Sequence, residues 1–249
     1  MSYLTPLYAL SKRNLILRYK HSFLGFLWGF LKPLLYLLIF LIVFGSQFTS
    51  TNDHILYITS GIIFWFFFAN ATTQGTHSIV QAAGLIKSIK LPTHFFPLAE
   101  IVSEFINLFM ALAVYFCLMP AFGLQFNVHF FWLVPIVIVF AWFTYSVTLL
   151  LSCLHVYYRD VGLLWTTLQP ALFYLTPIAF TEEHIPIRFM FIIKLNPFYY
   201  FIKLFRAPLY FHTAPDLLLF AKLAMATTLF WFIVNLLFKR MKNQFITSI

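Results

Sequence analysis

Two carboxylates, Glu100 and Glu104, are the side chains of this sequence best spaced for acid–base chemistry. They lie four positions apart, so on a helix they share one face. However, they fall at the start of an apolar stretch, whereas a membrane enzyme needs ionisable groups that converge at depth. An ion pair with Lys87, with Lys90 or with the basic N-terminal segment accounts for both carboxylates equally well.

The other reactive side chains form no catalytic or metal-binding pattern. The eight histidines include no HxxxH or HExxH spacing, and no nucleophile elbow is present. Cys117 and Cys153 lie in apolar stretches without metal-ligand spacing, so we interpret them as packing residues. We therefore expect no catalytic residue, no metal site and no cofactor in this chain.

The sequence also lacks the machinery to use ATP through a phosphate-binding loop. It contains no G-x-x-x-x-G-K-[ST] motif and not one Gly-Lys dipeptide. Its apolar stretches carry little charge for a proton or sodium relay. A transporter built this way must take its energy from a partner, or else it is a passive pore.

The composition indicates that the hydrocarbon of a membrane, rather than water, surrounds most of this chain. Hydrophobic residues make up 62% of the 249 residues and charged residues 9%, whereas a soluble domain carries about 25% charged residues. This excludes a soluble, disordered, disulfide-rich or coiled-coil protein. Six stretches are long enough to cross a bilayer as helices. They lie at about 31–50, 55–75, 98–119, 129–154, 161–180 and 217–238. The sequence therefore predicts an all-α membrane protein, with one transmembrane domain at 31–249.

The distribution of positive charge predicts the orientation. With the N-terminus in the cytoplasm, eleven of the sixteen Lys and Arg residues fall on the inside and five on the outside. The first apolar run is long for a signal peptide, and no good cleavage site follows it. We expect a multi-pass protein with both termini in the cytoplasm.

Residues 1–30 form a separate segment before the first predicted span. On a helical wheel its apolar residues share one broad face, and most of its basic residues share the other. Such a helix is expected to lie in the cytoplasmic interface with its basic face toward lipid phosphates. A simple positive-inside anchor explains the pattern equally well. The residues assigned to this interfacial helix are Arg13, Arg18, Tyr19 and Lys20.

The longest cytoplasmic loop, 76–97, shows apolar residues beside two lysines. A short helix within it must end before Pro92, because the residue before a proline disfavours helical geometry. Loops of this kind dock cytoplasmic partners, although the apolar side of this one also suits the bilayer surface. The candidate docking residues are Gly84, Leu85, Ile86, Lys87, Lys90 and Pro92.

The longest outside segment, 181–216, is divided by prolines into apolar runs too short to span a bilayer. Runs of this length suit re-entrant or interfacial helices, so we expect two half-helices that cap or line a pore from outside. Four positive charges lie on them: Arg188, Lys194, Lys203 and Arg206. Snorkelling to headgroups explains these charges, and contact with an anionic cargo is the alternative.

Aromatic side chains repeat on one face of two predicted spans. The first span carries Tyr36, Phe40 and Phe44, and the fifth carries Trp165, Gln169 and Phe173 at the same spacing. Rings that line a pore would offer flat apolar faces to the C–H faces of sugars and let a polymer slide. Because Phe occurs 34 times in the chain, ordinary helix or lipid packing is the alternative.

Several motifs together resemble one transporter family. The N-terminal segment 13–33 reads RNLILRYKHSFLGFLWGFLKP. The later stretches that agree are 61–70, 87–92, 158–161, 176–178 and 196–198. In this order they resemble the permease subunit of type-2 ABC exporters of O-antigen, capsule and teichoic acid, most closely the O-antigen permeases. Asn14 departs from the pattern, since an acidic residue is expected beside the arginine.

The resemblance implies a partner and a cargo. Such permeases form a homodimer with two copies of a nucleotide-binding ATPase subunit, in which ATP and magnesium are bound. The interfacial helix and the 76–97 loop would contact the ATPase, and the first and fifth spans of both protomers would line the channel. The 181–216 half-helices would gate its outer mouth. A lipid-linked polysaccharide would then cross the bacterial inner membrane outward.

Three other functions remain open at this point. The first is a type-2 ABC permease for another lipid or a drug. The second is a membrane-embedded transferase acting on lipid-linked sugars, which would need Glu100, Glu104 or His94 to reach its substrate. The third is a passive channel, which needs no ATPase.

Overall fold

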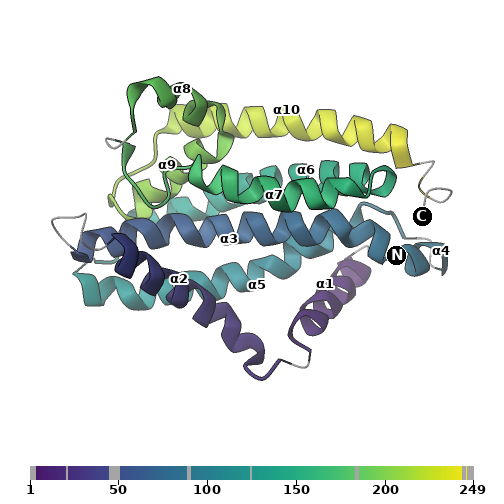
Figure 1. Cartoon of the computed structure of the whole chain (residues 1–249), viewed down its shortest axis with the longest axis horizontal. Helices are drawn as coiled ribbons and strands as arrows, with labels where there is room; N and C mark the ends of the chain where they lie inside the picture. Colours follow the sequence, from purple (N-terminus) through teal and green to yellow (C-terminus); the bar gives the residue numbers. More distant parts are fainter. Residues whose placement is uncertain are drawn as a thin grey trace.

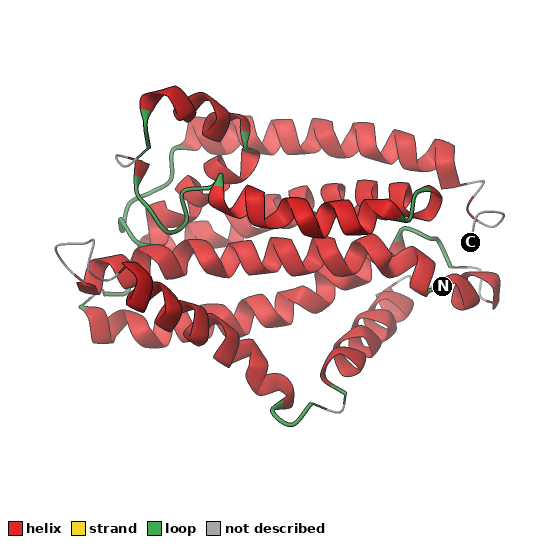
Figure 2. Ribbon diagram, viewed as in Figure 1, coloured by secondary structure: helices red, strands yellow, loops and turns green. Residues whose placement is uncertain are grey.

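The chain is helical throughout the part that can be described. The computed structural model describes residues 4–20, 22–44, 51–88, 91–123, 125–182, 185–242 and 245, and these residues contain no strand (Figure 2). The start of α1 (Leu4–Tyr19), the short α4 (Ala83–Ser88) and the end of α10 (Leu217–Met241) lie at one end of the long axis (Figure 1). The two short helices α8 (Ile187–Leu195) and α9 (Pro197–Leu209) lie toward the other end.

Four helices are long and apolar enough to cross a membrane. They lie within Ile55–Gln81, Phe95–Phe122, Val128–Tyr157 and Leu217–Met241. The first belongs to α3 (Thr51–Gln81) and the last is α10. The second consists of α5 (Phe95–Leu118) with the 3-10 turn Met119–Phe122, and the third of the 3-10 turn Val128–Trp132 with α6 (Leu133–Tyr157). The four predicted spans at 55–75, 98–119, 129–154 and 217–238 are confirmed as helices, and the chain is a multi-pass membrane protein.

The other two predicted spans coincide with shorter helices. After the 3-10 turn Gly25–Leu27, α2 runs over Trp28–Phe44, and α7 runs over Asp160–Tyr174. Their 17 and 15 residues give lengths of about 26 and 23 Å, less than the roughly 30 Å of hydrocarbon. Residues 45–50 of the predicted first span lie outside the described part. The predicted fifth span, 161–180, is helical only to Tyr174, because Pro177 disfavours helical geometry at Thr176.

Two short helices occupy the segment where the sequence predicts half-helices. They are α8 and α9, separated by Asn196. The side-chain oxygen of Asn196 accepts a hydrogen bond from the backbone N–H of Phe198 (3.0 Å), and Pro197 occupies the first helical position of α9. A cap and a proline at one junction explain why the chain makes two helices here instead of one.

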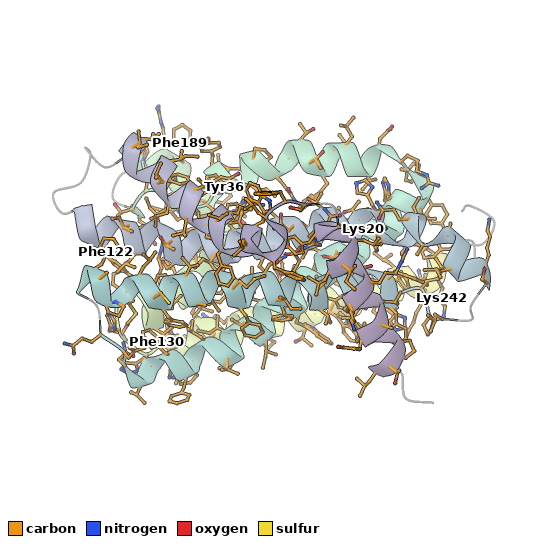
Figure 3. The ribbon with its side chains drawn as sticks, turned by 90° about the horizontal axis from the view of Figure 1, so that it is seen from below. Lys20, Tyr36, Phe122, Phe130, Phe189 and Lys242 are labelled. Atoms are coloured by element: carbon orange, nitrogen blue, oxygen red, sulfur yellow. The ribbon has the colours of Figure 1, made fainter. Side chains whose placement is uncertain are left out.

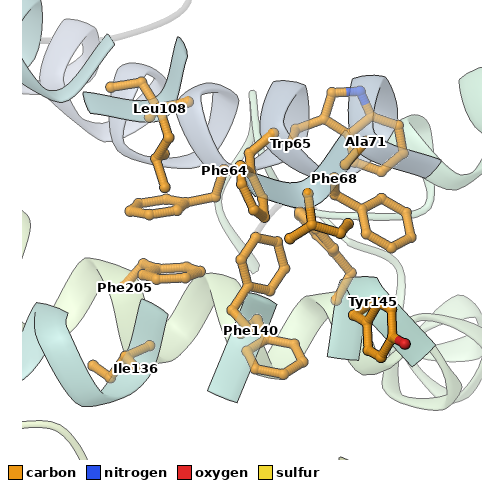
Figure 4. Close-up of a cluster of buried hydrophobic side chains, with 14 of the residues drawn as sticks. Phe64, Trp65, Phe68, Ala71, Leu108, Ile136, Phe140, Tyr145 and Phe205 are labelled. Carbon is orange, nitrogen blue, oxygen red and sulfur yellow. The ribbon is translucent and has the colours of Figure 1, made fainter. Parts of the chain in front are cut away.

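The core is built around α3, and aromatic rings dominate it. Phe64 of α3 stacks on Phe205 of α9 with ring centroids 3.4 Å apart, and Phe140 of α6 meets Phe64 edge-on (Figure 4). Trp65 and Phe68 extend the cluster along the next turn of α3. Aromatic pairs in these geometries add to the stability that area burial provides. For these rings, helix packing accounts for the aromatic excess.

Candidate functional site

Helix α7 is attached to the polar face of α3 by two of the predicted channel residues. The indole N–H of Trp165 donates to the Thr72 hydroxyl (3.0 Å). The side-chain amide of Gln169 donates to the carbonyl oxygen of Ala69 (2.9 Å) and to the hydroxyl of Thr73 (2.9 Å). In a single chain these two side chains therefore position α7 on α3.

The predicted aromatic residues of α2 also lie against α3. The Tyr36 ring meets Phe66 edge-on at 4.6 Å and is 40% exposed, so one face of it remains open. Phe40 approaches Phe173 of α7 with centroids 6.1 Å apart, and Phe173 in turn contacts Trp65 (5.4 Å). The structure thus brings α2 and α7 rings from the sequence pattern together over α3. Phe44, the remaining residue of the pattern, is the last residue of α2, and its side chain lies outside the described part.

The outward sides of α2 and α7 carry large apolar residues that are exposed among the described residues of a single chain. The exposed residues on α2 are Leu35, Leu38, Ile39, Ile42 and Val43, and those on α7 are Leu163, Leu164, Leu168 and Tyr174. A surface of this kind requires lipid or another subunit. The aromatic seam, by which we mean Tyr36, Phe40 and Phe173, lies between these two sides.

The N-terminal helix is held to α5 by the carboxylates singled out in the sequence. Arg18 forms ion pairs with Glu104, which is fully buried, and with Glu100 (3.4 Å). The Asn14 amide donates to Glu100 (2.7 Å), and the Tyr19 hydroxyl donates to Asn107 (2.6 Å). Of the partners that the sequence offers for these carboxylates, the N-terminal segment is the one that pairs with them among the described residues.

One detail of the predicted interfacial helix is wrong. Arg18 does not share a lipid-facing basic surface with Arg13 and Lys20, because a buried carboxylate on α5 needs a compensating cation. Arg13 and Lys20 are exposed, whereas the exposed apolar residues Leu4 and Tyr8 lie elsewhere on the helix. Arg18 is therefore not available for the predicted contact with lipid phosphates, and contact of Arg13 and Lys20 with lipid stays a prediction.

A polar cavity of about 270 Å³ lies between α1, α2, α3 and α5. Its lining includes Arg18, Asn107 and Gln74 together with Lys32. The Lys32 ammonium lies 3.4 Å from the side-chain oxygen of Asn70 and 4.7 Å from the centre of the Phe66 ring. The carboxylate of Glu104 also lines this cavity, so it combines two cations, one anion and the side-chain amides of Asn70, Gln74 and Asn107.

A pair of histidines, which the sequence analysis did not single out, fixes the beginning of α7. The ring nitrogens of His77 on α3 and His155 on α6 are hydrogen-bonded at 3.0 Å. Gly162 of α7 packs onto both rings, so closely that a Cβ there would lie 2.5 Å from His77 Cε1. Since 78 positions separate the two histidines, no local spacing rule could have identified the pair.

The predicted docking loop contains a short helix, α4. Gly84 and Lys87 are exposed, while Leu85 and Ile86 are partly buried and pack against the core. The helix ends at Ser88, before Pro92, as the sequence predicts. Pro92 is half-buried, and its carbonyl oxygen accepts from the N–H of Phe95 (3.0 Å). Lys90 lies outside the described residues.

Of the four outside charges, Arg206 is the one that is buried, being only 4% exposed. Its guanidinium donates to the carbonyl oxygens of Pro177 (2.7 Å) and Ile178 (2.8 Å) and to the Tyr57 hydroxyl (2.7 Å). These carbonyls belong to the non-helical backbone that follows α7. Arg206 thus supplies donors to a segment whose helix has ended, and contact of this residue with cargo stays a prediction.

The remaining three positive charges lie at the surface. Lys203 pairs with Glu182 (2.9 Å) and lies over the Tyr199 ring. Burial lowers the pKa of Lys203, but its hydrogen bonds to Tyr199 and Glu182 and the charge of Glu182 outweigh that effect and raise the pKa above its ordinary value. Arg188 and Lys194 are exposed on α8. Their contact with headgroups or cargo also stays a prediction.

The comparisons with known proteins agree with this arrangement. Residues 5–210 match the family described as ABC-2 type transporter. The chain belongs to the ABC-2 type transporter family. It is similar to the O-antigen export system permease protein RfbA of Myxococcus xanthus, with 26% identity over 248 residues, covering 98% of this chain and 95% of the relative. The RfbA protein of Klebsiella pneumoniae is 26% identical over 193 residues, covering 77% of this chain and 74% of the relative.

Family membership indicates which subunit hydrolyses ATP. The matched region is the membrane permease domain of an ABC-2 transporter, which lacks ATPase activity and works with a partner ATPase. This agrees with the missing phosphate-binding loop. The predicted membership of the type-2 ABC permeases is therefore confirmed.

Proposed function

We propose that this chain is the transmembrane subunit of an exporter that moves lipid-linked polysaccharide outward across the bacterial inner membrane. The observation that carries the proposal is its match to O-antigen export permeases over almost its whole length. A cargo with a long sugar chain needs a lined path rather than a closed binding site, and the aromatic seam offers flat apolar rings for such a path.

The proposed path requires two copies of the chain. The uncovered apolar sides of α2 and α7 flank the aromatic seam, so a second protomer that buries them would enclose the seam between four helices. Two copies of the ATPase would complete the assembly. Trp165 and Gln169 contribute by holding α7 against α3, and the polar cavity beside Lys32 would take the charged linkage between lipid and sugar.

The proposed topology has six crossings with both termini in the cytoplasm. The four long helices supply four of them, and α2 and α7 supply the others. Beyond Tyr174 the backbone is non-helical but buried, and Arg206 donates to its carbonyls, which is the condition under which irregular backbone is tolerated at membrane depth. Lys242 lies near one end of the long axis, Lys20 lies further in on the same side, and Phe122, Phe130 and Phe189 lie toward the other end (Figure 3). The basic end would face the cytoplasm.

Energy would enter at the cytoplasmic end. The surfaces proposed to contact the ATPase are α4 with its exposed Lys87 and the N-terminal helix that Arg18 attaches to α5. At the outer end α8 and α9, re-entrant in this topology, would gate the path. Because Arg206 links α9 to both α3 and the end of α7, a movement of either helix would reach this gate.

A transferase function is less well supported by the geometry. It would need Glu100, Glu104 or His94 to reach its substrate, yet both carboxylates accept from Arg18, which leaves His94 as the one candidate not held in these ion pairs. A passive channel would not belong to a family that works with an ATPase. Export of another lipid or a drug is the alternative that the family leaves open.

The test is made in cells that lack the gene for this chain. We expect the polysaccharide to disappear from the cell surface while the complete lipid-linked polymer accumulates inside. The wild-type gene should restore export only with a partner ATPase able to hydrolyse ATP. Unchanged surface polysaccharide would overturn the proposed cargo, and an incomplete polymer inside would favour the transferase.

A further inference from the structure

A second hollow, of about 310 Å³, lies between α6 and α10 at the end of the molecule where α5 begins. Its lining includes the polar side chains of Lys239, Lys242, Asn235 and His94 and the hydroxyl-bearing Tyr145. None of these residues belongs to α2 or α7, so the hollow is separate from the aromatic seam. Nothing in the proposed export path uses it. We call it the α6–α10 groove.

Among the described residues, no carboxylate opposes the charged end of the α6–α10 groove. Its described lining residues include no Asp or Glu, and among the described residues neither Lys239 nor Lys242 forms an ion pair. The two lysines are three positions apart and therefore share a face of the chain's last turns. Burial, and then the charge of Lys242, lower the pKa of His94, so at neutral pH the lysines supply the charge. Two uncompensated ammonium groups at a membrane surface attract an anion.

The other end of the groove is aromatic. The rings of Trp142 on α6 and Trp231 on α10 lie 4.9 Å apart and form part of its wall. Trp231 precedes Lys242 by about three helical turns, or roughly 16 Å along the helix. The groove thus has a cationic end at the interface and an apolar wall that reaches into the hydrocarbon, which is the polarity of a phospholipid.

We propose that the α6–α10 groove binds an anionic glycerophospholipid. The phosphate would accept charge-assisted hydrogen bonds from the ammonium groups of Lys239 and Lys242, with Asn235 as a further donor. One acyl chain would lie along Trp142 and Trp231. The inference goes beyond the export function and needs only that the chain is embedded in a membrane.

The test compares matched charge changes in the full chain, with its ATPase partner, in bilayer discs of phosphatidylglycerol and phosphatidylethanolamine. After extraction, native mass spectrometry counts the phosphatidylglycerol retained per chain. Lys239→Gln with Lys242→Gln should lower this retention about tenfold. The control, Arg240→Gln with Lys222→Gln, removes the same charge from exposed positions outside the groove lining and should retain the lipid. Equal retention by both double variants would overturn the proposal.

A second measurement begins with the unaltered protein and does not depend on how the lysine variants fold. Dibrominated phosphatidylglycerol should quench tryptophan fluorescence more than dibrominated phosphatidylcholine, and the excess should vanish in Trp142→Phe with Trp231→Phe. Protection against heat by glycerol phosphate or inorganic phosphate alone, equal to that by the lipid, would show a free-anion site and overturn the proposal. Loss of the ATPase from the lysine variant, with lipid retention unchanged, would show that a protein occupies the groove instead.

Discussion

Arg18 joins the N-terminal helix to the membrane domain through two carboxylates that are four residues apart on α5. Of these, Glu104 is fully buried and Glu100 only partly so. A buried carboxylate without a cation is strongly destabilising, whereas removing both charges together is much less so. The ion pair therefore determines where α1 lies, and with it one of the proposed contact surfaces for the ATPase.

We expect Arg18→Gln to lower the stability of the protein by about 3 kcal/mol, since it leaves the Glu104 charge uncompensated. Thermal unfolding of the purified chain in detergent measures the change. Adding Glu104→Gln should restore most of the loss, and Arg13→Gln, at an exposed position, should have little effect. If the double variant is no more stable than Arg18→Gln, the carboxylate charge is not the cause.

Gly162 allows α7 to approach the His77–His155 pair. In Gly162→Ala the new Cβ would overlap the His77 ring, and we expect a loss of about 1–3 kcal/mol, typical of overpacking. Replacing His77 with Ala in the same chain should recover part of the loss by making room. Gly84→Ala is the matched control, because nothing lies within 4 Å of the added Cβ. Equal unfolding temperatures for the Gly162 and Gly84 variants would contradict this packing.

At the scale of helices, the sequence correctly predicts the elements that appear as long apolar runs. The spans near 55–75, 98–119, 129–154 and 217–238 are unbroken apolar runs, and each forms a long helix. The run 161–180 is long enough to be predicted as a span, yet Thr176-Pro177 ends its helix early, a local backbone effect to which a hydropathy window is insensitive. The two short helices of 187–209 were predicted because prolines mark their ends.

The exact side-chain pairs that position the site could not be predicted in the same way, although the basic N-terminal segment is one of the partners that the sequence offers for Glu100 and Glu104. Arg18 with Glu104, and His77 with His155, join residues 86 and 78 positions apart, so each pair exists only once the helices pack. Arg206 shows the same limit. Counted by its position it is one more outside charge, but the structure buries it against backbone carbonyls of another element.

Arg206 leads to a prediction about an element, the non-helical backbone that follows α7. Arg206→Met removes the donors to the carbonyls of Pro177 and Ile178, and we expect a loss of at least about 2 kcal/mol. Hydrogen exchange of amides in 175–180 should speed up in the same variant. Arg206→Lys should not restore protection, because one ammonium cannot reproduce the geometry of the guanidinium. Arg188→Met, at an exposed position, is the control, and equal exchange in both variants would mean that Arg206 does not pin this segment.

For the whole molecule, the structure separates a basic end, an aromatic core and an end closed by two short helices. Transmission between the ends must pass through packed helices, because the described chain has no separate soluble domain to carry it. The deletion of 84–90 tests the proposed coupling. We expect the protein still to insert and to retain its fold, while export falls and the ATPase loses its stimulation by this chain. Lys222→Glu, far along the sequence from the docking loop, should leave both activities unchanged, and retained export in the deletion would remove the loop from the coupling surface.

The proposed polymer path is a property of two chains, since a single chain would supply only one side of it. Tyr36→Ala with Phe40→Ala removes two rings of the aromatic seam from each protomer, and four from the enclosed path. Each ring offers a weak contact of about 0.5–1 kcal/mol, so export should slow by about tenfold or more without loss of ATPase stimulation. Leu229→Ala with Phe232→Ala removes comparable side chains from the exposed surface of α10 and should leave the export rate unchanged. Export rates are measured as surface polysaccharide appearing after induction. If both double variants slow export equally, the effect arises from helix stability rather than from a path lined by Tyr36 and Phe40.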